Sequence, residues 1–221
     1  DDPRHAVMEW RLAYSVVKRL SCPLAGRTVL NYGCGDGRFA RLLRDRGARV
    51  VAVDASQQAI DQARAKDHHG IAYHVVNGAD LSVVPYRSID VAVSTFVLCR
   101  MQKQEDLDRV VKAVFDRIRT GGAYVLAEPH QEAVNRDFYS MRRMPQGDLV
   151  EGVPVDVQLM DGTGRTVREF WHGRQACLDT FRQAGFSVEH VIEPTMNTFP
   201  DEPCWKAERT CPPFVLFRLR K

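Results

Sequence analysis

The sequence predicts an α/β fold: a doubly wound, mostly parallel seven-stranded sheet with an antiparallel hairpin cap inserted after the fifth strand. Up to residue 127, short apolar runs alternate with amphipathic stretches of helical period, as in parallel strands joined by helices. After residue 130 the pattern changes to polar–apolar alternation on both sides of a glycine turn, which predicts antiparallel strands. The 221 residues, 44% hydrophobic and 27% charged, suffice for one globular domain.

The first half of the chain supplies five strands and the helices between them. Ser56 precedes a helical apolar stripe and suits an N-cap, because its hydroxyl can accept a hydrogen bond from a free N–H of the first turn. Gly47 is expected to end the preceding helix. The expected helices cover 6–20, the stretch from Phe39 to Gly47, 59–66 and 105–119, and the expected strands cover 28–32, 50–53, 71–76, 89–97 and 123–127.

The second half adds the hairpin and completes the sheet. Two alternating strands at 153–160 and 165–171 flank a turn at 161–164. A helix at 175–184 closed by Gly185 is followed by the last expected strands, at 186–192 and 214–218.

Two features at strand ends point to a bound cofactor with a nucleoside part. The first strand runs into Gly33-Cys34-Gly35-Asp36-Gly37, where glycines let the main chain approach a ligand and the next helix offers free N–H groups to a carboxylate. Asp54 closes the second strand at the offset where an acid meets ribose hydroxyls. Glycines also occur in ordinary tight turns, and Asp54 alone could be a helix cap. The two features therefore indicate a cofactor site only in combination.

These residues resemble motif I and its neighbouring acid in the class I, Rossmann-like S-adenosylmethionine-dependent methyltransferases. Further stretches are similar to the family's GDAxxLPF…SFDVV, LHHL and KPGG segments, namely 79–91, 96–101 and 119–122. Residues 183–186 with 192–194 are similar to the AGF…EP segment of its small-molecule members.

The resemblance implies S-adenosylmethionine as cofactor, S-adenosylhomocysteine as product, and no metal. Asp80 would accept a hydrogen bond from the adenine amino group, and Leu81 would flank the ring. The implied cofactor-binding residues are Asn31, Gly33, Cys34, Gly35, Gly37, Asp54, Ala55, Asp80, Leu81 and Phe96.

The sequence departs from the family pattern at two places. Asn31 stands where motif I usually begins with an acid, and Cys99-Arg100 replaces a pair of histidines. A neutral Asn31 forfeits the charge-assisted part of a hydrogen bond to an ammonium group. This substitution is the best argument for the alternative of a non-catalytic cofactor-binding or partner-binding domain.

We expect one methyltransferase domain over 1–221, in four parts. Residues 1–25 form an N-terminal helical cap and 26–130 the cofactor-binding core. Residues 131–172 form the inserted cap over the acceptor site, and 173–221 complete the core.

Methyl transfer from a sulfonium is an in-line displacement, so we expect catalysis mainly by positioning, without a covalent intermediate or metal. Ligands of open parallel sheets lie beyond the carboxyl ends of the strands, which places Arg100, Glu128 and His130 on the acceptor side. His130 is the preferred general base because its ordinary pKa suits proton removal at neutral pH, although a histidine there is more often a polar loop residue. His172 and Tyr14 are rivals, and Arg100 is expected to take part in catalysis or to orient an anionic acceptor.

The inserted cap is expected to close over a small organic acceptor, methylated on oxygen or nitrogen, in natural-product biosynthesis. Tyr14, Phe138, Tyr139 and Trp171 are the expected substrate-binding residues, with Met141 and Met144 beside them. For the side chains of the insertion, Phe138, Tyr139, Met141, Met144 and Trp171, the equal alternative is that they form the core of the insertion itself, because a hairpin without apolar support is unstable.

Other functions find less support. The net charge of +3 is dispersed and does not predict a coherent basic surface, and the fourth strand lacks an Asn-Pro-Pro-Tyr type motif. A nucleic-acid substrate is therefore not the expected one, and RNA or protein methylation is kept only as an alternative. A nicotinamide-dependent dehydrogenase would need GxGxxG spacing instead of GxGxG. No apolar run approaches the ~20 residues that span a bilayer, and the six cysteines are not paired in metal-binding motifs, so we expect a cytoplasmic protein with reduced thiols and no membrane partner.

Overall fold

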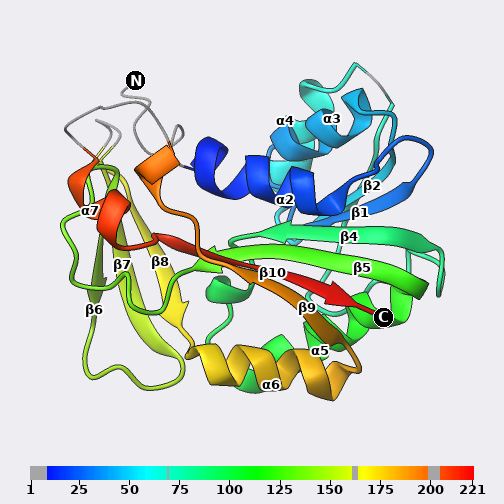
Figure 1. Cartoon of the computed structure of the whole chain (residues 1–221). Coiled ribbons are helices and arrows are strands. Elements are labelled where there is room, and N and C mark those ends of the chain that lie inside the picture. Colours follow the sequence, from blue (N-terminus) through cyan, green and yellow to red (C-terminus); the bar gives the residue numbers. More distant parts are fainter. Residues whose placement is uncertain (1–8, 69, 161–163, 199–204) are drawn as a thin grey trace.

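The computed structural model describes residues 9–68, 70–160, 164–198 and 205–221, and it confirms the expected fold class (Figure 1). The large sheet consists of β1 (Thr28–Tyr32), β2 (Arg49–Asp54), β3 (Ala72–Val75), β4 (Ile89–Thr95), β5 (Ile118–Pro129), β9 (Ser187–Ile192) and β10 (Phe214–Arg220). Its strand order is β3-β2-β1-β4-β5-β10-β9. β1 to β5 pair in parallel, whereas β10 runs antiparallel to both β5 and β9.

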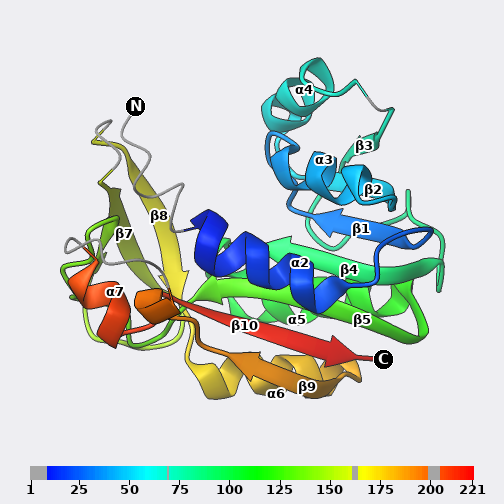
Figure 2. The same cartoon turned by 45° about the horizontal axis from the view of Figure 1, so that its top comes forward.

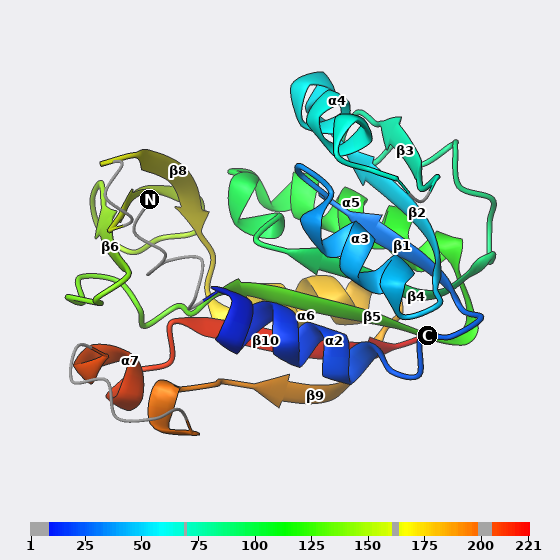
Figure 3. The same ribbon diagram turned by 90° about the horizontal axis from the view of Figure 1, so that it is seen from above.

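Helices cover both faces of this sheet (Figures 1 and 2). One face packs against α2 (Ser15–Ser21), α3 (Arg38–Asp45) and α4 (Gln57–Ala65), and the other against α5 (Gln104–Arg117) and α6 (Arg174–Ala184). Seen from above, α2 crosses over β5 and β10 (Figure 3). The shorter helical segments are the π-helical η1 (Glu9–Tyr14), the 3-10 turns η2 (Leu98–Arg100) and η3 (Met196–Thr198), and α7 (Lys206–Thr210).

Local chemistry sets several of these boundaries as the sequence predicts. The Ser56 hydroxyl accepts a hydrogen bond from the Ala59 N–H at 3.2 Å and caps α4. Gly185 ends α6 in the left-handed region, with φ of 108°. Arg49 and Asp54 extend the expected second strand by one residue at each end.

The inserted cap is larger than expected. It consists of β6 (Met141–Pro145), β7 (Val153–Leu159) and β8 (Thr166–Trp171), paired antiparallel in that order, beyond the carboxyl end of β5 (Figure 1). The prediction of a hairpin missed β6, because its two arginines and proline interrupt polar–apolar alternation. The expected turn residues 161–163, and the start of the expected first helix at 6–8, lie outside the described residues.

Within the described ranges, no helix is long and apolar enough to cross a membrane. Cys22, Cys34, Cys99, Cys177 and Cys211 are free thiols, and Cys204 lies outside the described residues.

The sheet separates two apolar layers, one on each face. In the layer under α6, Phe181 is fully buried and meets Phe217 of β10 edge to face, with ring centroids 5.1 Å apart. Aromatic packing at this point therefore joins α6 to β10, the neighbour of the edge strand β9.

We expect Phe181→Ala to lower the free energy of unfolding by about 3–5 kcal/mol, because truncation leaves a cavity in a close-packed layer. Phe181→Leu retains most of the volume and should cost about 1 kcal/mol. Urea unfolding of both variants measures the difference, and equal losses would contradict this packing role.

Candidate active site

A cavity of about 640 Å³ lies at the carboxyl ends of the parallel strands. Its walls come from the segments that follow β1, β2, β3 and β4, so four stretches distant in the sequence meet there. Its lining residues are Tyr32, Gly33, Gly35, Asp54, Ala55, Ser56, Val76, Gly78, Thr95, Phe96, Val97, Arg100 and Met101. The expected cofactor-binding residues Gly33, Gly35, Asp54, Ala55 and Phe96 are thus brought together.

The glycine turn after β1 needs glycine for two different reasons. Gly33 has φ of +71°, and a Cβ added to it would lie 2.3 Å from Cγ2 of Val97, so only glycine fits. A Cβ on Gly35 would meet no protein atom within 4 Å. The space beside Gly35 is therefore open to a ligand that approaches the main chain.

Asp54 fixes the edge of the cavity. One carboxylate oxygen accepts a hydrogen bond from the Gly35 N–H at 2.8 Å, and the other accepts one from the Ser56 N–H at 2.9 Å. Both bonds hold the carboxylate in one orientation at the end of β2. Each carboxylate oxygen has a further lone pair with which to accept from a ligand hydroxyl.

Tyr32, at the end of β1, connects to the segment after β3 on another wall of the cavity. Its hydroxyl donates to the carbonyl of Gly78 at 2.9 Å. Burial, and secondarily the charge of Asp54, raises the pKa of Tyr32 to about 12, so the phenol remains a donor at neutral pH.

Asn31 and Cys34 are both buried beside this cavity, and neither lines it. The Asn31 side-chain oxygen is buried without a hydrogen-bond partner in the described part of the chain. Such an acceptor suits a donor such as an ammonium group. Burial, followed by the charge of Asp54, raises the pKa of the Cys34 thiol to about 12, which makes it an inert core residue. Gly37 caps α3 in the left-handed region, behind the turn.

Asp80 and Leu81 do not lie together as expected. Asp80 is exposed and lines an adjoining cavity of about 530 Å³ that shares Gly78, Arg100 and Met101 with the larger one. Its carboxylate accepts from the Ser82 N–H at 3.0 Å, which lowers the pKa of Asp80. The Leu81 side chain is fully buried in the core, so the expectation that it flanks a ligand ring is wrong for the described cavities.

A separate, smaller cavity of about 120 Å³ lies between the cap and the large sheet. Phe96 and Arg100 line both it and the 640 Å³ cavity, so the two cavities meet at these residues. Phe96 has φ of +58° and packs on Phe214 with ring centroids 4.8 Å apart. Ligands in the two cavities would therefore both contact Phe96 and Arg100.

Comparison with known proteins agrees with this geometry. A family model described as a methyltransferase domain matches residues 29–122. The chain is 26% identical over 179 residues to N-demethylindolmycin N-methyltransferase of Streptomyces griseus, in an alignment that covers 78% of this chain and 76% of that one. Residues 29–122 therefore form a class I S-adenosylmethionine-dependent methyltransferase domain.

One further relative and one solved structure are similar to this methyltransferase. It is 32% identical over 138 residues to malonyl-acyl-carrier-protein O-methyltransferase of Pseudescherichia vulneris, covering 57% of this chain and only 52% of that one. A crystal structure of an S-adenosylmethionine-dependent methyltransferase from Mesorhizobium loti matches with a TM-score of 0.72 at 24% identity, over 97% of this chain and 98% of that chain. That likeness shows the shared fold.

The histidines expected as bases do not line the cavity at the cap. His130 is buried, its Nδ1 accepts from the Glu132 N–H, and its Nε2 lies 3.2 Å from Glu193. Burial lowers the pKa of His130. His172 bonds through Nε2 to the carbonyl of Met101 and lies 3.1 Å from Glu151 through Nδ1. Both rings fasten loops of the methyltransferase, and of the three expected catalytic residues only Arg100 lines the junction.

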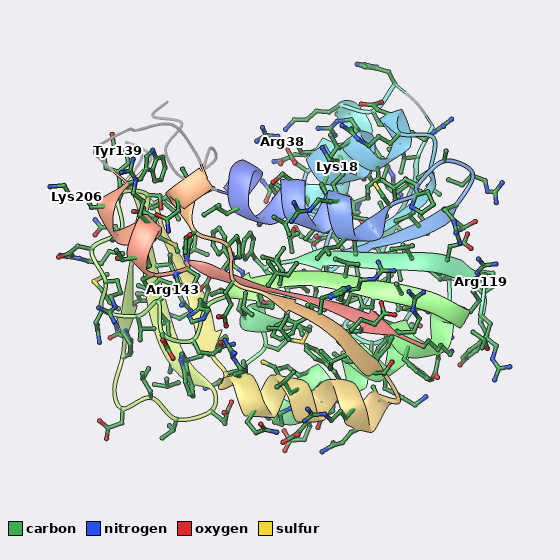
Figure 4. The ribbon with its side chains drawn as sticks, viewed as in Figure 1. Lys18, Arg38, Arg119, Tyr139, Arg143 and Lys206 are labelled. Atoms are coloured by element: carbon green, nitrogen blue, oxygen red, sulfur yellow. The ribbon has the colours of Figure 1, made fainter. Side chains whose placement is uncertain are left out.

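The aromatic residues expected to bind substrate make structural contacts instead, three of them in the cap and Tyr14 on α3. Phe138 is buried in the core, and Tyr139 packs edge-on against Trp205, at the end of the cap near α7 (Figure 4). The Trp171 indole N–H donates to the carbonyl of Gln131. Tyr14 stacks on Phe39 with centroids 5.1 Å apart. The alternative that these side chains form structural packing is the better description of their contacts.

Apart from Phe96, Arg100 and Met141, the cap cavity is lined by residues that sequence reasoning missed. Arg143 of β6, Val157 of β7 and Glu169 of β8 line it with Phe214 of β10. The polar–apolar alternation of β7 and β8 could have pointed to these residues, since Val157, Val167 and Glu169 share one face of the hairpin. Which face of the hairpin turns toward the core depends on β6, the strand that the sequence did not predict.

Glu128 anchors the turn that carries Arg100. Its buried carboxylate accepts hydrogen bonds from the N–H groups of Val97, Leu98 and Cys99 at 3.0–3.3 Å. Burial nevertheless raises the pKa of Glu128 to about 7, because desolvation of the charge outweighs these bonds. Glu128 thus positions η2 and titrates near neutrality.

We expect the free energy of unfolding to fall as the pH rises from about 4.5 to about 7, because the folded chain there keeps a proton on Glu128 that the unfolded chain releases. Glu128→Gln should remove a pH dependence of about 3 kcal/mol over this window. Urea unfolding at several pH values measures it, with the exposed Glu105→Gln as control. An unchanged pH profile in Glu128→Gln would contradict the raised pKa.

Proposed function

We propose that this methyltransferase transfers the methyl group of S-adenosylmethionine to an oxygen or nitrogen atom of a small organic molecule. The observation that carries the proposal is the meeting of two cavities of unequal size at Phe96 and Arg100. A cavity of about 120 Å³ under the cap admits part of a small molecule and excludes a folded macromolecule. The names of the two relatives, an N- and an O-methyltransferase, support both acceptor atoms.

The residues around the larger cavity fit the cofactor. Asp54 would accept from ribose hydroxyls, and the open space beside Gly35 would receive the amino-acid part. Asp80 would accept from the adenine amino group in the adjoining cavity. When bound, the cofactor supplies an electrophilic methyl group on a sulfonium.

The protein contributes positioning. Displacement requires the acceptor atom and the methyl carbon to lie about 3–3.5 Å apart and in line. Phe96, held by Phe214, forms a wall common to both cavities, and the Glu128 carboxylate fixes the turn that presents Arg100. The described residues include no group of three or more metal-ligating side chains.

The direct test is a thermal melt with S-adenosylmethionine, S-adenosylhomocysteine and NADH added separately. We expect both sulfur compounds to raise the melting temperature, because ligand at 100 times its dissociation constant stabilises by about 2.7 kcal/mol. NADH should have no effect. A shift with NADH alone would refute the proposed cofactor.

We further expect Asp54→Ala to weaken S-adenosylhomocysteine binding by about tenfold to a hundredfold, because hydrogen bonds to a charged group contribute about 1.5–3 kcal/mol. Asp61→Ala removes an exposed acid of α4 outside the cavity and serves as the matched control. Calorimetry measures both affinities. Unchanged affinity in a folded Asp54→Ala variant would rule out its role at the ribose.

A further inference from the structure

The strand β8 of the cap contributes side chains to two different cavities. Val167 and Glu169 line the cavity of about 120 Å³ under the cap, whereas Phe170 lines the cavity of about 530 Å³ that contains Asp80. Successive side chains of a strand point to opposite faces, so residues 167 and 169 share one face of β8 and residue 170 lies on the other. The strand therefore divides its side chains between the acceptor side and the cofactor side.

Hydrogen bonds on either side of Phe170 fasten this part of the cap to the turn after β4. The carbonyl of Arg168 accepts from a guanidinium nitrogen of Arg100 at 2.7 Å, and His172 donates from Nε2 to the carbonyl of Met101 at 2.8 Å. Arg100 and Met101 line both the 640 Å³ and the 530 Å³ cavity. Phe170 is thus held beside the cofactor cavities by the residues two before and two after it.

The cap also approaches this wall through its main chain. Gly152, directly before β7, has φ of +76°, and a Cβ on it would lie 2.4 Å from the carbonyl oxygen of Gln102. Gln102 itself lines the 530 Å³ cavity. Glu151 fixes the same end of the cap, because its carboxylate accepts from the Gly173 N–H at 3.0 Å and lies 3.1 Å from Nδ1 of His172. The placement of the cap against the cofactor side is therefore set by several contacts.

Phe170 is the one aromatic side chain among the described residues that line the 530 Å³ cavity. It is partly buried and, unlike Phe96 and Tyr139, makes no ring contact with another aromatic residue in the described part of the chain. The same cavity holds the carboxylate of Asp80, which can accept from an amino group. Nucleobases stack on aromatic side chains through their π faces. The cavity therefore offers both kinds of contact that an aminated aromatic ring can use.

We propose that the cap takes part in cofactor binding and that Phe170 packs its ring on the adenine of S-adenosylmethionine. The inference rests on the proposed function, to which it adds a cofactor contact from outside the matched stretch 29–122. Asp80 would accept from the adenine amino group while Phe170 covers the ring from the cap. Cofactor and acceptor would then share β8 as a common wall.

Calorimetry of the full chain tests the contact with S-adenosylhomocysteine and with 5′-methylthioadenosine, which keeps the adenosine part but lacks the amino-acid part. We expect Phe170→Ala to weaken the binding of both compounds by about tenfold, because base stacking on an aromatic ring contributes on that scale. Phe170→Tyr restores a ring and should bind both compounds as the parent chain does. Val150→Ala, which truncates an exposed apolar residue of the cap outside the cavity, is the control and should leave both affinities unchanged.

A spectroscopic signature distinguishes stacking from a purely structural role of Phe170. In Phe170→Trp, a bound adenine should lie on the new indole and quench its emission. The parent chain has tryptophans at 10, 171 and 205, so its own change in emission with each compound is measured and subtracted. This variant also retains the test if Phe170→Ala does not fold.

The outcomes separate the two proposals. If S-adenosylhomocysteine binds the parent chain but binds a folded Phe170→Ala variant equally well, the role of Phe170 is refuted and the proposed function stands. Equal weakening in Val150→Ala, or no quenching in Phe170→Trp beyond that of the parent chain, likewise refutes the contact with adenine. If S-adenosylhomocysteine does not bind the parent chain, the proposed function fails and the contact fails with it.

Discussion

The two hydrogen bonds of the Asp54 carboxylate organise the edge of the sheet at which the cofactor cavity forms. They join the N–H of Gly35, after β1, to the N–H of Ser56, at the start of α4. Parallel strands end side by side, so their following loops meet at one edge of the sheet, where a ligand can bind. One acid at the end of β2 fixes the loops after β1 and β2 relative to each other, and Tyr32 extends the arrangement to Gly78 after β3.

The acceptor side is organised by buried charges. Glu128 accepts three N–H groups of the turn that carries Arg100, and Arg143 joins β6 to the end of β5 through the His130 carbonyl. Buried charges are costly unless paired and hydrogen-bonded, and their partners therefore define one relative placement of cap and sheet. Around this polar framework the cavity walls are apolar, which allows a small organic group to be enclosed.

Reasoning from the sequence succeeded where an element is decided locally. The Ser56 cap, the Gly185 stop and the alternation of strands and helices up to β5 follow from residue type and period, because neighbours along the chain determine them. It failed where contacts come from distant segments. β6 has no strand-like alternation, so it was not expected as a strand. Leu81 follows Asp80 in a segment similar to the family pattern and was expected to contact the ligand, but its side chain packs in the core.

The sequence by itself determined the fold class, the glycine turn, Asp54 and thereby the methyltransferase family, since these features lie in short stretches with fixed spacing. Only the tertiary structure decided which side chains face the acceptor. His130, Tyr139 and Trp171 turned out to fasten loops and the cap, whereas Arg143 and Glu169 came into the cavity from separate strands. The reason is physical: a side chain's role in a pocket depends on which face of its element the rest of the chain covers, and the cap acquires that orientation only when β6 packs against β7.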